Sequence, residues 1–185
     1  MFFLFSVMTP KRALALIFLL SLLSMAHSPV AAALAQPHSA NAVKTAFIFN
    51  ILKFVSWPTT TQSKELTLCA LGDDPLDGQL SYLVKRRVGN RKIRLISNPP
   101  ADAFNRCDAL FIPHGAEQAL SQLGHISAAP VLTISDSATF IDHGGMIGLP
   151  VQAGRVRLEV NRNTIQEANL RISSELLQVA SKVAP

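Results

Sequence analysis

Residues 108–135 read DALFIPHGAEQALSQLGHISAAPVLTIS, and this stretch decides the fold. Residues 108–112 and 131–135 are short, continuous apolar runs, which are typical of strands that are buried on both faces of a sheet. Residues 116–123, between them, have the composition of a crossover helix. A strand, a helix and a second strand in this order predict parallel neighbours in one sheet, with helices covering its faces.

Further strand patterns lie on both sides of this unit. Residues 65–71 have strand composition and end at a turn cluster of glycine, aspartate and proline, and residues 91–96 alternate between charged and apolar side chains. Residues 146–151 and 155–161 are two strand-like runs separated by Gln-Ala-Gly. The expected class is therefore α/β, with a mainly parallel sheet flanked by helices and a C-terminal antiparallel hairpin.

The chain is expected to close with one more helix. Ser173 or Ser174 is a suitable N-cap for it. Its buried stripe would consist of Leu176, Val179, Ala180 and Val183.

A helix is also predicted over residues 43–57, before the first long strand, with Pro58 ending it. One apolar stripe recurs at steps of three and four residues: Val43, Ala46, Phe47, Ile51, Phe54 and Val55. Ile48, Phe49 and Leu52 lie towards the opposite side, so the helix is apolar nearly all round. Such a helix is either enclosed by its own domain or presents a face to another protein. Ile48, Phe49 and Leu52 are therefore candidates for a partner or dimer interface.

The N-terminus has the pattern of a secretory signal peptide over residues 1–35. Lys11 and Arg12 precede an apolar run, and small residues follow up to Ala33-Leu34-Ala35. A retained membrane anchor is the alternative, but the apolar run is shorter than the roughly 20 residues that a spanning helix needs. We expect residues 36–185 to form a single periplasmic α/β domain. After cleavage the protein would not be an integral membrane protein. Cleavage would lower the net charge from +5 to +3, because two basic residues and no acidic residue leave.

Cys69 and Cys107 are the two cysteines of the chain. In an oxidising compartment such a pair indicates one disulfide, and two buried, inert thiols are the alternative. The closed loop would span 38 residues, which corresponds to about 3–4 kcal/mol in the chain-entropy model.

The sequence offers no motif for catalysis, cofactors or metals. The cysteines and histidines lack metal-ligand spacing, and neither a G-x-S-x-G elbow nor a phosphate-binding glycine loop occurs. We therefore expect no enzyme and no bound cofactor. Asp73, His114 and Asp136 follow predicted strands and can meet at the sheet edge where α/β folds bind ligands. A hydrolase that uses Ser135 is a weaker alternative.

The strongest charge feature is a basic cluster formed by Lys85-Arg86-Arg87, Arg91-Lys92 and Arg94. Tyr82 is the aromatic residue close to it in sequence, and an exported protein rarely meets DNA, so we expect no nucleic-acid partner. A solvated surface is the default interpretation. Contact with an acidic partner or with anionic lipid head groups is the alternative, and Arg86 is its candidate residue.

Six segments in order resemble the YfiR family of periplasmic proteins. They are residues 43–58, 68–75, 131–136, 144–149, 155–161 and 170–177. The resemblance implies a Rossmann-like α/β domain that is exported and often dimeric. It also implies negative regulation of an inner-membrane diguanylate cyclase, through contact with the periplasmic sensor domain of that enzyme. Cys69 and Cys107 match one disulfide of the family, whereas residues 146–158 lack the cysteines of a second one.

The resemblance therefore implies that the protein restrains a membrane-bound signalling enzyme and so lowers cyclic di-GMP, and the lack of catalytic motifs agrees with a periplasmic binding protein. The alternative function is a periplasmic small-ligand binding or sensing protein that uses the edge near Asp73, His114 and Asp136.

Overall fold

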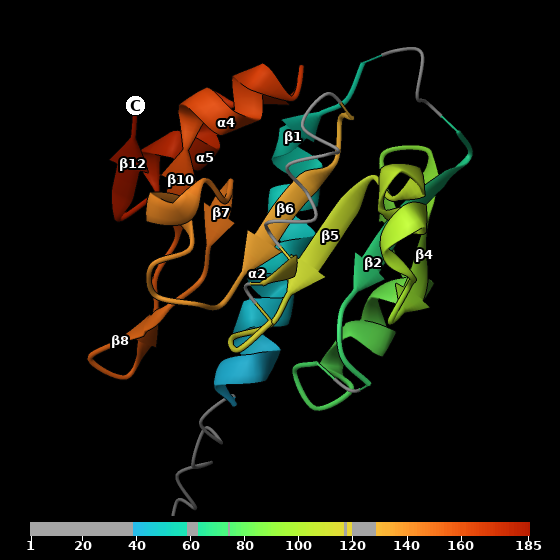
Figure 1. Ribbon diagram of the computed structural model, residues 1–185, viewed down its shortest axis with the longest axis horizontal. Coiled ribbons are helices and arrows are strands. Elements are labelled where there is room, and N and C mark those ends of the chain that lie inside the picture. The colour runs from blue at the N-terminus through green and yellow to red at the C-terminus, as the bar shows by residue number, and fades with distance from the viewer. Residues whose placement is uncertain (1–38, 59–62, 74, 117, 120–128) are drawn as a thin grey trace, which may run out of the picture. The chain divides into compact units, whose positions relative to one another are not determined.

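Figure 1 shows a computed structural model of the chain, which describes residues 39–58, 63–73, 75–116, 118–119 and 129–185. The chain forms two units, Met1–Pro37 and His38–Pro185, and the described residues belong to the second. The expected signal peptide and much of the expected crossover helix at 116–123 lie outside the described residues. Within the described part, no helix combines the length and the apolar character needed to span a membrane.

The second unit is built on an eight-stranded sheet in the order β12-β10-β7-β6-β5-β2-β4-β3. Its strands are β2 (Glu65–Ala70), β3 (Arg87–Val88), β4 (Arg91–Ser97), β5 (Ala109–Ile112), β6 (Leu132–Ser135), β7 (Ile147–Gly148), β10 (Glu159–Asn161) and β12 (Lys182–Ala184). The pairs from β4 to β7 are parallel, whereas β3 and β10 pair antiparallel with β4 and β7. The predicted α/β class with a mainly parallel sheet is confirmed.

Strands β5 and β6 lie at the centre because their side chains are apolar or small on both faces. Every residue of both strands is buried, and β5 pairs with β2 on one side and with β6 on the other. This explains why the apolar runs are continuous in sequence instead of alternating.

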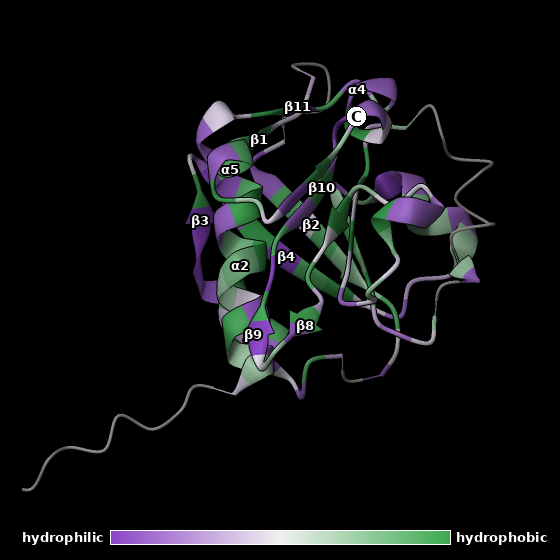
Figure 2. Ribbon diagram, turned by 90° about the vertical axis from the view of Figure 1, so that its left-hand side faces the viewer, coloured by the Kyte–Doolittle hydropathy of each residue, from purple (hydrophilic) through white to green (hydrophobic). Residues whose placement is uncertain are grey.

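The two faces of the sheet are covered differently. Helix α2 (Ala40–Phe54), the 3-10 helix η3 (Gln79–Lys85) and helix α5 (Ser174–Gln178) contribute to the larger core on one face. The smaller core contains Phe104, from the 3-10 helix η4 (Ala101–Arg106), Phe140, and both cysteines. Figure 2 shows α2 and α5 together on one side of the sheet.

Two helix boundaries differ from the sequence prediction. Helix α2 ends at Phe54, because residues 55–56 form strand β1 (Val55–Ser56) and pair antiparallel with β11 (Arg171–Ile172). Ser173 caps α5 as predicted, but α5 ends at Gln178 and residues 182–184 form β12. Of the predicted stripe, Leu176 is buried and Ala180 is half-buried, but Val179 and Val183 are 66% and 44% exposed, so the prediction is wrong for these two residues.

The predicted hairpin is present as two short paired segments. Strands β8 (Val151–Gln152) and β9 (Arg155–Val156) pair antiparallel at its tip, and β7 pairs with β10 at its base. The chain then enters helix α4 (Arg162–Glu167), which Asn161 caps by accepting a hydrogen bond from the Thr164 N–H.

Candidate protein-interaction surface

Helix α2 provides the surface that we consider first. It begins after Ser39, whose Oγ accepts a hydrogen bond of 3.1 Å from the Ala42 N–H and so satisfies one free donor of the first turn. The helix has no acidic residue, and Lys53 lies in its last turn, where a cation complements the helix dipole.

The buried side of α2 combines residues from both apolar sides of the predicted helix. Ile48, Ile51 and Leu52 are 0% exposed and belong to the larger core. Of the two alternatives for this helix, enclosure by its own domain therefore applies to Ile48 and Leu52. Their burial contradicts the hypothesis that they contact a partner, because their side chains are not available in this conformation. Phe49 is only partly buried. With apolar residues on both sides, the hydrophobic pattern alone did not distinguish the inner face from the outer one.

The outward side of α2 carries three residues of the predicted apolar stripe. Ala46 is exposed, and Val43 and Phe47 are half-buried. Together with Ala42 and Asn50 they line a mainly apolar groove of about 360 Å³, which we call the α2 groove. Figure 2 shows that much of the ribbon of this helix has the colour of apolar residues.

Phe49 of α2 and Arg86, both predicted interface residues, lie next to each other. The Arg86 Cζ is 5.7 Å from the centre of the Phe49 ring, and the Lys53 Nζ is 5.5 Å from it. Two cations therefore flank one aromatic ring, an arrangement that orients both cationic side chains. Arg86 follows η3, so this contact joins α2 to the basic cluster of the sequence.

The predicted ligand edge of the sheet is present only in part. Asp136, after β6, accepts a hydrogen bond of 2.7 Å from the His114 N–H, after β5. Its other carboxylate oxygen forms an ion pair of 2.6 Å with the Lys44 Nζ of α2, and both side chains are largely buried. Asp73 is exposed. Since both oxygens of Asp136 have protein partners, this arrangement fixes α2 to the sheet more than it offers a carboxylate to a ligand.

The weaker hydrolase hypothesis depended on Ser135. Its side chain is 0% exposed, and its Oγ accepts a hydrogen bond of 3.1 Å from the Ser137 N–H. A substrate therefore has no direct access to this hydroxyl in the described conformation. Among the described residues there is also no group of three or more His, Cys, Asp or Glu placed to hold a metal ion.

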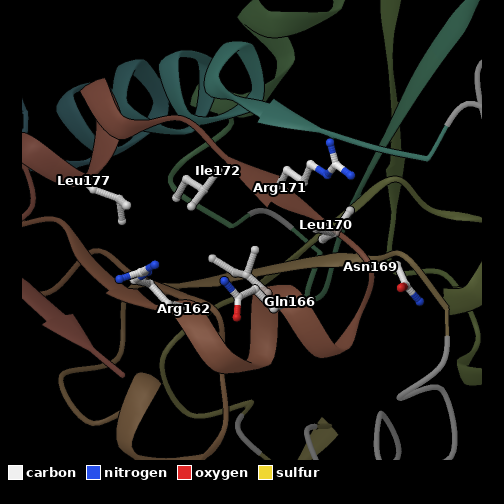
Figure 3. Close-up of a pocket in the computed structure, with 8 residues that line it drawn as sticks. Arg162, Gln166, Asn169, Leu170, Arg171, Ile172 and Leu177 are labelled. Atoms are coloured by element: carbon white, nitrogen blue, oxygen red, sulfur yellow. The ribbon is translucent and has the colours of Figure 1, made fainter.

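A second cavity lies between α4, β11 and α5, and sequence reasoning missed it. Its volume is about 500 Å³, and its lining is drawn in Figure 3. The lining combines polar residues with aliphatic ones: Arg162, Gln166, Asn169, Arg171, Ile165, Leu170, Ile172 and Leu177. No short motif signals this cavity, because its residues come from three elements and the connection between two of them.

The cysteines form one disulfide, which joins strand β2 to the residue preceding Asp108 and β5. The bridge is buried in the smaller core, on the sheet face opposite α2. Beside it, Arg91 Nη2 lies 2.7 Å from both carboxylate oxygens of Asp108, and the Trp57 Nε1–H donates to the Asp108 carbonyl. Arg91 therefore belongs to the internal structure, although it is part of the basic cluster in sequence.

Two surface groups near the C-terminus have altered acidity. The hydrogen bond from Lys182 to Asp142 raises the pKa of the Lys182 ammonium, and the hydrogen bond from Ser173 lowers the pKa of the Glu175 carboxyl. Neither group lines the α2 groove, so the groove carries no titrating side chain near neutral pH.

Comparison with known proteins identifies relatives of the whole unit. The model of the YfiR/HmsC-like family matches residues 41–181. A solved structure of a conserved domain protein from Vibrio cholerae O1 biovar El Tor has a TM-score of 0.53 at 9% identity; the match covers 77% of this chain and 60% of that one. The ABC domain of Streptococcus pneumoniae in complex with L-Trp has a TM-score of 0.45 at 11% identity, with 63% and 54% covered. At these identities the first likeness concerns the fold alone.

Proposed function

The chain belongs to the YfiR/HmsC-like family, and on this premise we propose that it restrains a membrane-bound diguanylate cyclase by binding the periplasmic sensor domain of that enzyme. Family membership supports a periplasmic regulator of this enzyme class in general. Export with cleavage after Ala35 is part of the proposal. The buried disulfide supports it, because such bonds persist in oxidising compartments.

The α2 groove is the surface that we assign to this contact. Protein interfaces combine an apolar, often aromatic centre with a charged rim. Here Phe47, Val43 and Ala46 supply the apolar centre, and Lys53 and Arg86 beside Phe49 supply cations at one end. A mainly apolar groove on α2, with Ala46 exposed and Val43 and Phe47 half-buried, is the single observation that favours binding of another protein.

Ala46→Glu tests this surface with little risk to the fold, since Ala46 is exposed and glutamate is a good helix former. The matched control is Ala101→Glu, the same change at an exposed position of η4 on the other sheet face. A carboxylate in an apolar contact costs roughly 2–3 kcal/mol, which weakens binding about 30- to 150-fold.

The readouts are intracellular cyclic di-GMP in the native host and binding to the purified sensor domain. Deletion of the gene should raise cyclic di-GMP, and expression of the wild-type chain or of Ala101→Glu should return it to the original level. Ala46→Glu should remain folded but leave cyclic di-GMP high. If Ala46→Glu converts a dimer into a monomer yet still binds the sensor domain, the groove joins two copies and the assignment to the cyclase is wrong.

A small-ligand function is the second candidate, and the cavity of Figure 3 favours it over the edge at Asp136. The lining combines Arg162 and Arg171 with aliphatic side chains, a composition that suits a small carboxylate with an apolar body. A thermal-shift screen tests this, because a ligand at 100 times its Kd stabilises the folded form by about 2.7 kcal/mol. Absence of any shift with such acids, or an equal shift in Arg171→Gln, would contradict it.

A further inference from the structure

The free edge of the sheet at β3 carries a concentration of positive charge with few carboxylates near it. Residues 38–64 and 78–101 contain no aspartate or glutamate. They include five exposed cations, which we call the basic patch: Lys53, Lys85, Arg86, Arg87 and Lys92. Within the described part of the chain, none of these five forms an ion pair with a carboxylate. Arg94 nearby forms a long one, 3.8 Å, with Glu65.

The strand register brings like charges together. Arg87 of β3 lies directly opposite Lys92 of β4 in an antiparallel pair. Side chains at such positions share one face and lie about 5 Å apart at Cβ, so two cations there destabilise the pair. A fold that keeps this repulsion at an exposed edge gains from any anionic surface that neutralises it.

An exposed aromatic residue accompanies the cations. Tyr82, the one tyrosine of the chain, is 67% exposed, and Val84 is 37% exposed. Both belong to η3, a 3-10 helix in which side chains three positions apart eclipse each other, so Tyr82 projects from the same side as Lys85. Tyrosine, with an apolar ring and a polar hydroxyl, is enriched where hydrocarbon meets water at membrane surfaces.

From these observations we infer that the basic patch binds the anionic head groups of a lipid bilayer, with Tyr82 and Val84 at the level of the head groups. The cations lie along the free edge of the sheet: Arg86 contacts Phe49 of α2, whereas Arg87 and Lys92 share the β3–β4 pair. The two cavities described above are lined by other residues. Exposed cations outside any cavity suit a layer of anionic head groups better than they suit the packed apolar centre of a protein interface.

Membrane attachment of this kind can be tested apart from the proposed cyclase contact. Lys53 and Arg86 belong both to the basic patch and to the charged rim proposed for that contact. Lys85, Arg87 and Lys92 belong to the patch alone, and lipid binding needs no protein partner. Each basic side chain at an anionic surface contributes about fivefold to the partition coefficient. Five of them with one interfacial tyrosine are enough for reversible binding that weakens as salt screens the charges.

The test is co-sedimentation of the full-length gene product, expressed in a bacterium and purified, with vesicles of equal parts phosphatidylglycerol and phosphatidylcholine. Lys85→Glu/Arg87→Glu should lower the partition coefficient about thirtyfold or more. The matched control, Arg155→Glu/Arg162→Glu, has the same charge change at exposed positions of β9 and α4, far from β4 in Figure 1. The control variant should lose less than about threefold, since its charges lie outside the patch.

Tyr82→Trp gives a second readout, because it adds an exposed indole to a chain whose other tryptophan, Trp57, is 9% exposed. Its emission should shift to the blue with the anionic vesicles and remain unchanged with pure phosphatidylcholine. Equal binding to both vesicle types, equal loss in both charge variants, or no binding at low salt would each overturn the inference. Loss of sensor-domain binding in Lys85→Glu/Arg87→Glu, without any vesicle binding by the wild type, would assign the patch to an acidic protein instead.

Discussion

Opening the Cys69–Cys107 disulfide should destabilise the domain by an amount that follows from its loop length. The bridge closes a loop of 38 residues. In the chain-entropy model, removing such a cross-link increases the entropy of the unfolded chain by an amount equivalent to about 4 kcal/mol at room temperature. Cys69→Ala/Cys107→Ala should lose this and, because both sulfurs are buried against Phe104 and Phe140, about 1–2 kcal/mol more in lost packing.

Urea unfolding followed by the fluorescence of Trp57 measures both effects. Trp57 is the only tryptophan and donates a hydrogen bond to the carbonyl of Asp108, next to Cys107, so its emission reports on this part of the fold. Reduced wild type isolates the cross-link because it keeps both sulfurs. The double variant in the presence of reductant is the control, and reductant should not change its unfolding midpoint.

A loss below about 1 kcal/mol on reduction would refute loop closure as the main contribution of the bridge. The same samples separate a staple from a switch. The bridge lies in the smaller core and the α2 groove lies on the other face, so reduced protein that is still folded should bind its partner with unchanged affinity. A lower affinity of the folded, reduced protein would show that the bridge controls binding.

Two further substitutions test how α2 and the hairpin are held. Lys44→Met should lower the free energy of unfolding, measured in urea, by about 3–5 kcal/mol, because it leaves the largely buried carboxylate of Asp136 without its cation. Lys44→Met/Asp136→Asn should recover part of that loss, and equal losses in both variants would contradict a charge penalty. Gly145→Ala should destabilise the protein by at least about 2–3 kcal/mol, because the new Cβ would lie 2.2 Å from the buried ring of Phe140. Gly144→Ala should destabilise it by only about 1 kcal/mol, because that residue has a φ of 88° but open space around it. The opposite order of stability in thermal melts would refute the steric argument.

The central strands could be predicted from sequence because their burial leaves a local signature. β5 and β6 are buried at every residue, so their apolar runs are continuous and need no knowledge of neighbours. The C-terminal helix was overextended for the opposite reason. Whether residues 182–184 are helical or extended depends on pairing with β10, more than twenty residues earlier in the chain, and no local pattern records that partner.

The orientation of α2 also depended on a distant partner. A lysine on an apolar helix normally marks the exposed side, but Lys44 faces inward because Asp136, 92 residues away, neutralises it. The sequence therefore predicted the helix and the disulfide pair, but it did not distinguish the inner face of the helix from the outer one, and it did not show that Phe49 and Arg86 are in contact. The cavity of Figure 3 was missed for the same reason, since only the tertiary fold brings its residues together.

The pairing of β1 with β11 has a consequence for the order of folding. It joins Val55 to Ile172, 117 positions further along, and the Ser173 N–H donates to the carbonyl of Phe54 at the end of α2. Contacts this remote form slowly, because most of the chain must be present before either end is fixed. The contacts that fix the C-terminal end of α2 therefore form only once the C-terminal segment has folded. A protein that recognises the helix in this final position thus encounters it in finished molecules and not in nascent chains.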